Sequence, residues 1–242
     1  MPWTKKQISQ HIRAAKELSK IKDEFFSFLK PGVSEYEAVE FLRKKYKEHG
    51  LWSVHAPIVA FGQNTSFVHY FPSQYSRRFQ QGDLVLLDIW ARVREVGAPF
   101  ADMTWCGFYG RRIPSEMEKV FRSVLLARDA SIRFLRSRVR EGVVPRGREV
   151  DAVARGVLEG AGYGKYFLHG LGHPLGFRSP HGTGARLSQK KGEGALEKRV
   201  GYTIEPGVYL KNKFGARSEI DFYIDGKEVV ITTPVQKTIT KI

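Results

Sequence analysis

Five side chains of the types that bind divalent metals occur along this chain at repeating intervals. In order they are Asp88, Asp102, His173, Glu205 and Glu219. The two aspartates are 14 positions apart, the two glutamates are also 14 apart, and each glutamate follows its aspartate by 117 positions. Both acidic pairs lie in runs typical of strands. Two similar halves, each donating two carboxylates from neighbouring strands, would build one shared site between them.

These five side chains suit a pair of divalent metal ions. Four carboxylates gathered in one cleft repel one another by on the order of several kcal/mol unless cations cancel their charge. Oxygen-rich ligation with one imidazole suits Mn, Co, Zn or Fe(II) better than a structural zinc site. His173 would supply that imidazole from the glycine-rich run HGLGHPLG. We expect two metals, manganese first among them, about 3.5–4 Å apart and bridged by carboxylates and a water.

Four helices are predicted around these strands. Apolar positions recur at helical spacing over residues 4–30, 34–49, 115–141 and 148–160. Thr4 is the expected N-cap of the first helix, and Ser34 with Glu37 forms a capping box for the second. The second half of the chain then repeats the first, with a long helix, a Gly-Val turn, a shorter helix and strands. The repeat predicts an α+β fold of two pseudo-symmetric halves, with helices covering a strongly curved antiparallel sheet.

Strand-like runs hold the acidic residues and several aromatic ones. The runs are HAPIVAFG, VHYF, LVLLDIWARV, APFADMTWCGF, YTIEPGVYL and ARSEIDFYI, and GQNTS is expected as a loop after the first of them. Four aromatic side chains either wall a pocket or pack in the core, and core packing is the more common use of such residues: Tyr70, Phe71, Trp90 and Trp105.

Length and composition describe an ordinary globular protein. At 242 residues the chain has ample material for a core, and no low-complexity linker divides it, so we expect a single domain over residues 1–242. The N-terminal residues lack the apolar core of a secretory signal, and no run of 18 apolar residues predicts a membrane span. The single cysteine, Cys106, excludes an internal disulfide and suits a reducing, cytoplasmic compartment, with its thiol expected in the core.

The chain carries a net charge of +15, and many arginines lie on the helix predicted over residues 115–141. They are expected to form a solvated basic face opposite an apolar one, and attraction to RNA, ribosomes or anionic surfaces is the alternative. No nucleic-acid-binding motif accompanies the charge. The arginines are Arg122, Arg128, Arg133, Arg136, Arg138 and Arg140.

The chain resembles the pita-bread metallopeptidases, the family that contains Xaa-Pro aminopeptidase (aminopeptidase P), prolidase and methionine aminopeptidase. The matching segments are LLDIW, FADMTW, HGLGHPLG, PHGTG, TIEPGVYL and ARSEI, and the resemblance covers nearly the whole chain. Each segment alone is weak, but all of them in this order and spacing are highly specific. The resemblance implies a single metallopeptidase catalytic domain over residues 1–242, without the additional N-terminal domain of prolidases and aminopeptidases P.

The resemblance implies a role for each of the five metal-binding residues. Asp88 corresponds to the terminal ligand of one metal, whereas His173 and Glu205 correspond to ligands of the other. Asp102 and Glu219 correspond to the two bridging carboxylates. Glu205 also corresponds to a general base that takes the proton from the bridging water.

Further side chains take roles around the substrate by the same resemblance. His69 corresponds to the substrate-side histidine, and His181 to the one that binds the scissile carbonyl and steadies the tetrahedral intermediate. Thr104 corresponds to a hydroxyl that orients a ligand. His169 and Arg217 are similar to residues on the prolidase and aminopeptidase P side of the family, and methionine aminopeptidases lack both features. For His169, packing or loop hydrogen bonding competes with a direct catalytic role.

The chain also departs from the family pattern. Trp90 and Pro174 stand where the family usually has glycine. The interval between Asp88 and Asp102 is a few residues longer than in typical members, which implies a longer hairpin over residues 92–99 that alters the pocket rim. The remaining histidines match no motif and are expected at the surface or at the edge of the core: His11, His49 and His55.

The resulting expectation is a dinuclear metal-dependent exopeptidase that uses a metal-bridging hydroxide to hydrolyse Xaa-Pro bonds of a peptide substrate. Methionine aminopeptidase is the alternative within the family. A non-catalytic pita-bread protein that binds peptide or RNA is the alternative of another class, supported by the charge of +15. The resemblance leaves monomer and homodimer open, and homodimers are common in the family.

Overall fold

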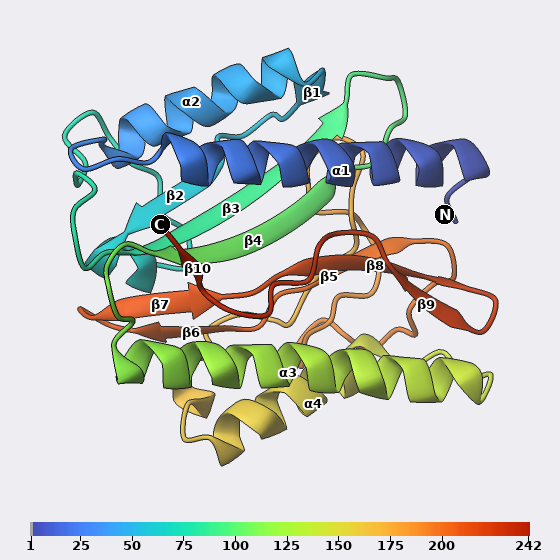
Figure 1. The fold of residues 1–242 in the computed structure, drawn as a ribbon. Helices are drawn as coiled ribbons and strands as arrows, with labels where there is room; N and C mark the ends of the chain where they lie inside the picture. The colour runs from blue at the N-terminus through green and yellow to red at the C-terminus, as the bar shows by residue number, and fades with distance from the viewer. Residues whose placement is uncertain (1) are drawn as a thin grey trace.

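Two helix pairs form the outer layers of the molecule and enclose the strands between them (Figure 1). The computed structural model describes residues 2–242. The first pair is α1 (Lys5–Phe28) and α2 (Glu35–Glu48), and the second is α3 (Ser115–Arg140) and α4 (Gly147–Gly160). Each pair is a long helix followed by a shorter one. The predicted α+β arrangement of two pseudo-symmetric halves covered by helices is therefore confirmed.

Side-chain caps define the starts of the first two helices. Thr4 Oγ1 accepts a hydrogen bond from the Gln7 amide, and Gln7 Oε1 accepts one from the Thr4 amide. Ser34 and Glu37 form the same reciprocal pair at the start of α2. Each box satisfies two N–H groups that the first helical turn leaves without a partner. The capping residues predicted from the sequence are thus confirmed.

The strands pair almost entirely in antiparallel fashion. In the first half β1 (Leu51–Trp52), β2 (Ile58–Phe61), β3 (Leu84–Val93) and β4 (Ala101–Phe108) form one sheet, to which β10 (Thr240–Lys241) adds in parallel. In the second half β5 (Gly201–Ile204), β8 (Ile220–Asp225) and β9 (Glu228–Ile231) form a second sheet. The hairpin of β6 (Gly207–Leu210) and β7 (Phe214–Arg217) forms a third.

Hydrogen bonds join the two halves where β4 lies beside β8. The Asp102 amide donates to the Asp221 carboxylate at 2.8 Å, so a side chain takes the place of a backbone partner. The Glu219 amide reaches the Thr104 carbonyl at 3.5 Å. A buried carboxylate thus helps to close the seam, and the same contacts bring Asp102 and Glu219 to one place.

Each half has its own hydrophobic core between its helices and its strands. Cys106 is fully buried in the core of the second half, as expected for the lone thiol. Arg128 does not lie on the solvated face of α3, contrary to the sequence-based expectation. It is only 1% exposed, because it lies on the buried face of α3, where its guanidinium donates to Ser218 Oγ and the Gln236 carbonyl.

The run VHYF, predicted as a strand, lies outside every strand. It follows a 3₁₀ helix, η1 (Gly62–Ser66), in the segment predicted as a loop. No neighbouring strand pairs with residues 67–71 in the part of the chain that the structure describes. Among residues 2–242, no helix combines the length and the apolar character that crossing a membrane requires.

Candidate metal centre

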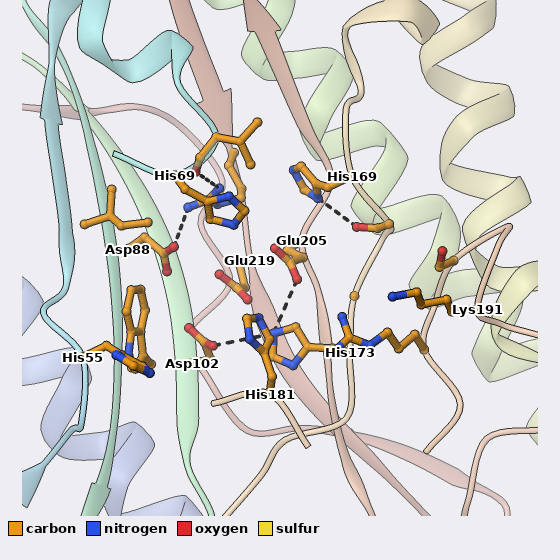
Figure 2. A pocket seen from close by; sticks show the side chains of 18 of the residues that line it. His55, His69, Asp88, Asp102, His169, His173, His181, Lys191, Glu205 and Glu219 are labelled. Atoms are coloured by element: carbon orange, nitrogen blue, oxygen red, sulfur yellow. Dashed lines mark hydrogen bonds and ion pairs between the residues drawn. The ribbon is translucent and has the colours of Figure 1, made fainter. Parts of the chain in front are cut away.

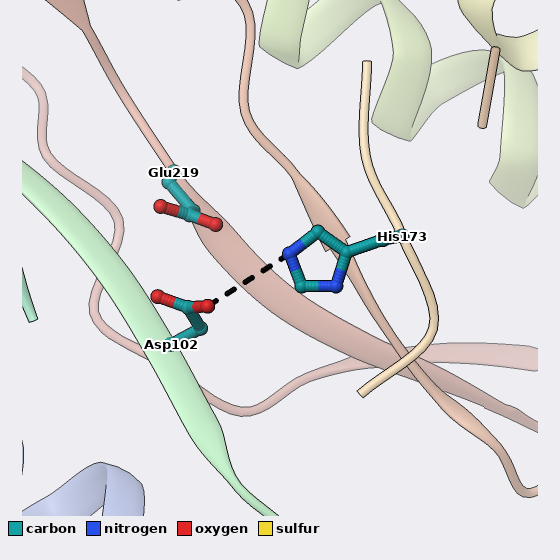
Figure 3. A group of neighbouring side chains, drawn as sticks. All are labelled: Asp102, His173 and Glu219. Atoms are coloured by element: carbon teal, nitrogen blue, oxygen red, sulfur yellow. Dashed lines mark ion pairs between the residues drawn. The ribbon is translucent and has the colours of Figure 1, made fainter. Parts of the chain in front are cut away.

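Three side chains from distant parts of the sequence meet at the seam between the halves (Figure 3). Asp102 on β4, Glu219 just before β8, and His173 each offer a ligand atom, and these atoms lie within 4.8 Å of one another. All three residues are at most 5% exposed. His173 Nε2 lies 3.8 Å from Asp102 Oδ2. Such a group of oxygen and imidazole nitrogen atoms can bind one divalent cation.

Hydrogen bonds orient the His173 ring toward the acids. Its Nδ1 lies 2.9 Å from the Pro174 carbonyl oxygen, and a carbonyl only accepts, so Nδ1 carries the proton. The lone pair of Nε2 therefore faces Asp102 and Glu205, whose Oε1 is 3.6 Å away. Thr203, a residue that sequence reasoning did not single out, accepts from the His173 amide and donates to Glu205 Oε1.

Asp88 lies in the same pocket but is held by an arginine. Arg217 Nη2 donates to Asp88 Oδ2 at 2.5 Å. The same guanidinium donates to Thr104 Oγ1, and that hydroxyl donates to Glu219 Oε2 at 2.7 Å. Thr104 thus contacts one of the clustered acids, as expected for an orienting hydroxyl.

Burial and mutual repulsion make the cluster unfavourable when all its acids are charged. Burial raises the pKa of Asp102 well above its usual range, and the nearby Glu219 charge adds to the rise. Burial, followed by the Glu205 charge, does the same to the pKa of Glu219. Burial raises the pKa of Glu205 to about 8 and lowers that of His173 to about 3. A positive charge placed among these groups would stabilise their ionised forms.

Two buried carboxylate oxygens without partners in residues 2–242 also indicate that the site fits divalent cations. Asp88 Oδ1 and Asp102 Oδ1 are both buried, and neither has a hydrogen-bond partner among the described residues. An unpartnered buried carboxylate oxygen is costly, and a metal ion would satisfy it. The donor set of four carboxylates and one imidazole therefore fits such ions.

The five residues line one cavity of about 510 Å³. Figure 2 shows the four carboxylates in the middle of this pocket, with His69, His169 and His181 around them. The His181 ring stands nearly perpendicular to that of His173, with ring centres 4.2 Å apart. His69 is an exposed residue at the cavity wall.

Both nitrogens of His169 are already bonded. Nδ1 lies 2.8 Å from the Gly170 carbonyl and Nε2 lies 2.9 Å from the Tyr209 hydroxyl. The carbonyl requires the proton on Nδ1, so Nε2 accepts from Tyr209. Tyr209 in turn accepts from Arg217 Nη1. The ring therefore supports the arginine that holds Asp88.

Several pocket residues were missed or misplaced by sequence reasoning. His55 is exposed, as expected, but it also lines the cavity, as do Phe71 and Trp90. His11, expected at the surface or the core edge, is instead buried, with 1% of its surface exposed. No residue of the hairpin over 92–99 is among those that line the cavity, and its effect on the pocket rim stays a prediction. Glu95 of this hairpin accepts hydrogen bonds from Gln10 and Arg13, so the hairpin contacts α1. Basic residues between the PHGTG run and Glu205 also line the pocket: Arg186, Lys190 and Lys191.

The chain is similar to known peptidases over most of its length. The model of metallopeptidase family M24 matches residues 9–226. A putative dipeptidase of Bacillus subtilis, YkvY, is 31% identical over 231 residues, which cover 93% of this chain and 60% of that protein.

Solved structures agree with this match. A recombinant prolidase from Thermococcus sibiricus is 28% identical with a TM-score of 0.86, covering 99% of this chain and 62% of that one. An X-Pro aminopeptidase from Thermotoga maritima is 26% identical with a TM-score of 0.89, covering 100% of this chain and 65% of that one. This chain thus spans 60% to 65% of the length of these three relatives. The resemblance to the pita-bread metallopeptidases is confirmed, and the chain belongs to metallopeptidase family M24.

Proposed function

We propose that this protein is a dinuclear metal-dependent peptidase that hydrolyses Xaa-Pro peptide bonds. One observation carries the proposal. Asp102, His173 and Glu219 meet within 4.8 Å, and Asp88 and Glu205 line the same cavity. The two unpartnered oxygens, Asp88 Oδ1 and Asp102 Oδ1, support a site that needs cations.

The resemblance to the family divides the five metal-holding residues between two ions. His173 and Glu205 would bind one ion, Asp88 the other, and Asp102 with Glu219 would bridge them. When bound, the ions supply Lewis acidity and an activated water. Manganese is our first candidate, ahead of cobalt, zinc and iron.

The chain's own residues would perform the remaining steps. Glu205, whose Oε1 lies 3.6 Å from His173 Nε2, would accept the proton of the attacking water and return it to the leaving amine. His181, beside His173, would donate a hydrogen bond to the scissile carbonyl as negative charge develops on it. His69, which lines the same cavity, would contact the substrate.

Short peptides are the substrates that the pocket favours. Acidic groups lie at its centre, and Arg186, Lys190 and Lys191 lie along one wall. This arrangement suits a small zwitterion whose amine approaches the acidic side chains and whose carboxylate approaches the basic side chains. Phe71 and Trp90 offer apolar surface for a prolyl ring.

An activity profile tests the proposal. Purified protein supplied with Mn²⁺, Co²⁺ or Zn²⁺ should release proline from Ala-Pro, and activity should vanish with chelator and return with metal. Methionine aminopeptidase is the alternative within the family. Cleavage of Met-Ala-Ser with no turnover of any Xaa-Pro peptide would establish that alternative instead.

Polyanion binding is the competing function of another class. Arg133, Arg136 and Arg140 lie along one exposed stretch of α3 and border a surface hollow, and the net charge is +15. A protein that contains no metal after purification, and binds RNA with strong salt dependence, would favour this function. The cytoplasmic location, the single-domain organisation and a homodimer stay predictions.

A further inference from the structure

Part of the pocket wall is formed by a segment without strand pairing. Residues 62–77 connect the region after β2 to the approach to β3, and only η1 gives them regular structure. Val68, His69 and Phe71 of this segment line the cavity. A segment outside a sheet needs other contacts to hold its side chains in place.

One buried carboxylate makes many of those contacts. Glu35, the first residue of α2, is 0% exposed. Its Oε1 accepts from the Phe61 amide at 2.7 Å, and its Oε2 accepts from the Tyr70 hydroxyl at 2.6 Å and the Arg77 amide at 3.1 Å. Asn64 Nδ2 lies 3.0 Å from each oxygen. The partners span the segment from its start to its end.

The chemistry of these partners matches a carboxylate. Every contact to Glu35 comes from an N–H or O–H group, and an ionised carboxylate is the side chain that only accepts. Burial of such a charge is costly unless several hydrogen bonds satisfy it. The segment and the carboxylate therefore stabilise each other.

The position of His69 depends on its neighbours. Its side chain makes no hydrogen bond within the described residues 2–242. The Val68 carbonyl accepts from Arg217 Nη1 at 3.3 Å, and Tyr70 is bonded to Glu35. His69 is thus held between two anchored residues, and in Figure 2 it lies on the same side of the pocket as Asp88.

We propose that Glu35 is a positioning residue that fixes residues 62–77 and thereby sets His69 and Phe71 against the metal centre. It does not touch the reacting atoms. The predicted effect of Glu35 on turnover rests on the proposed Xaa-Pro peptidase function. The predicted effect of Glu35 on the conformation of residues 62–77 does not depend on that function.

The test compares Glu35→Gln with Glu37→Gln in the intact chain. Glu37 lies in the same helical turn and accepts from Ser34 and Arg78, outside the segment. In Glu35→Gln, the side-chain NH₂ group would face the N–H and O–H groups that now donate to the carboxylate. Hydrogen exchange of amides 62–77 should speed up about tenfold or more in Glu35→Gln and remain unchanged in Glu37→Gln. Exchange in β3 should stay the same in both.

Kinetics provide the second readout. The variant and the unmodified protein are compared at equal metal content and at a temperature well below the melting temperature of the variant. Glu35→Gln should lower kcat/KM for Ala-Pro about tenfold, chiefly by raising KM. A purely structural role would lower the melting temperature without these local changes. Tyr70→Phe removes the hydrogen bond that Tyr70 donates to Glu35 and the one that it accepts from Asn64, and leaves the other contacts of Glu35 in place. It should show the same changes at smaller size, and it tests the proposal if Glu35→Gln fails to fold.

Two results would overturn the proposal. One is exchange in residues 62–77 that is as slow in Glu35→Gln and Tyr70→Phe as in Glu37→Gln. The other is faster exchange with unchanged KM and kcat. Absence of Xaa-Pro cleavage by the unmodified protein would overturn the proposed function alone, because exchange is measured without substrate.

Discussion

Arg217 Nη2 donates to Asp88 Oδ2 at 2.5 Å, although 129 positions of sequence separate the two residues. Both are buried. The same guanidinium also contacts Thr104 and Tyr209, so one side chain joins β3, β4 and the β6–β7 hairpin around the pocket. A planar group with several donors in fixed directions suits this task, and a lysine ammonium does not.

Replacing Arg217 by lysine is therefore expected to damage both stability and activity. Lys keeps the charge but loses the simultaneous contacts, which should lower the free energy of unfolding by about 2 kcal/mol and kcat/KM by about 100-fold. Urea unfolding and Ala-Pro hydrolysis measure the two effects. Arg13→Lys is the control, because Arg13 pairs with Glu95 at the surface and should cost less than about 0.5 kcal/mol. Equal behaviour of the two variants would contradict the assigned role.

Asp102→Asn should change stability in opposite directions with and without metal. Without metal, the variant removes one of the buried charges that repel each other, and its free energy of unfolding should exceed that of the unmodified protein by about 1–2 kcal/mol. With saturating Mn²⁺ the order should reverse, because the variant loses a ligand and the stabilisation that binding brings. Thermal unfolding with chelator and with Mn²⁺, together with elemental analysis, checks this. The same order of stability under both conditions would count against a metal centre here.

Stability should fall below neutral pH partly because of His11. Its Nδ1 lies 2.9 Å from the Phe100 carbonyl, and burial lowers its pKa from 6.5 to about 4. The facing acid, Asp221, is 3.9 Å away, but burial raises its pKa well above the usual range. The unfolded chain therefore binds a proton on this residue more readily between pH 6.5 and 4. The contribution of neutral His11 to the free energy of unfolding is complete above pH 6.5 and is lost as the pH falls toward 4.

His11→Gln isolates that effect. A glutamine offers both a donor and an acceptor but does not titrate, so the variant should lose less stability between pH 7.5 and 4.5 than the unmodified protein, by about 2.5 kcal/mol. Chelator-treated protein should be used, so that metal release does not contribute. Parallel stability curves for the two proteins would show that His11 is not responsible.

The basic wall of the pocket predicts a preference for a free carboxylate. Lys191→Met should raise the KM for Ala-Pro about tenfold, since a charge-assisted bond to the substrate carboxylate would be lost. The KM for Ala-Pro-amide, which lacks that charge, should be nearly unchanged. Steady-state kinetics with both substrates give the answer, and an equal rise in the two KM values would mean that Lys191 acts on the shape of the pocket.

Local patterns in the chain were sufficient for the helices and for the identity of the clustered acids. The Thr4 and Ser34 caps depend on residues three positions apart, and hydrophobic spacing reports which face of each helix is buried. The repeated 14-residue intervals reflect the duplicated halves. These signals are local or periodic, so they can be read without coordinates.

Other features depended on contacts between distant residues. Nothing near VHYF in the sequence indicates that Tyr70 would donate a hydrogen bond to Glu35, on another element. Similarly, Arg128 falls at the helical spacing of the buried residues of α3, but the sequence does not reveal its partner, because Ser218 lies 90 positions away.

The sequence by itself determined which chemical groups are present, their order and the helices that carry part of the scaffold. Only the tertiary structure decided that Arg217 would hold Asp88, that His169 would support Tyr209 and that His55 would face the pocket. The physical reason is that hydrogen bonds and burial depend on distance in space, and the seam between two halves brings together residues that no local spacing relates.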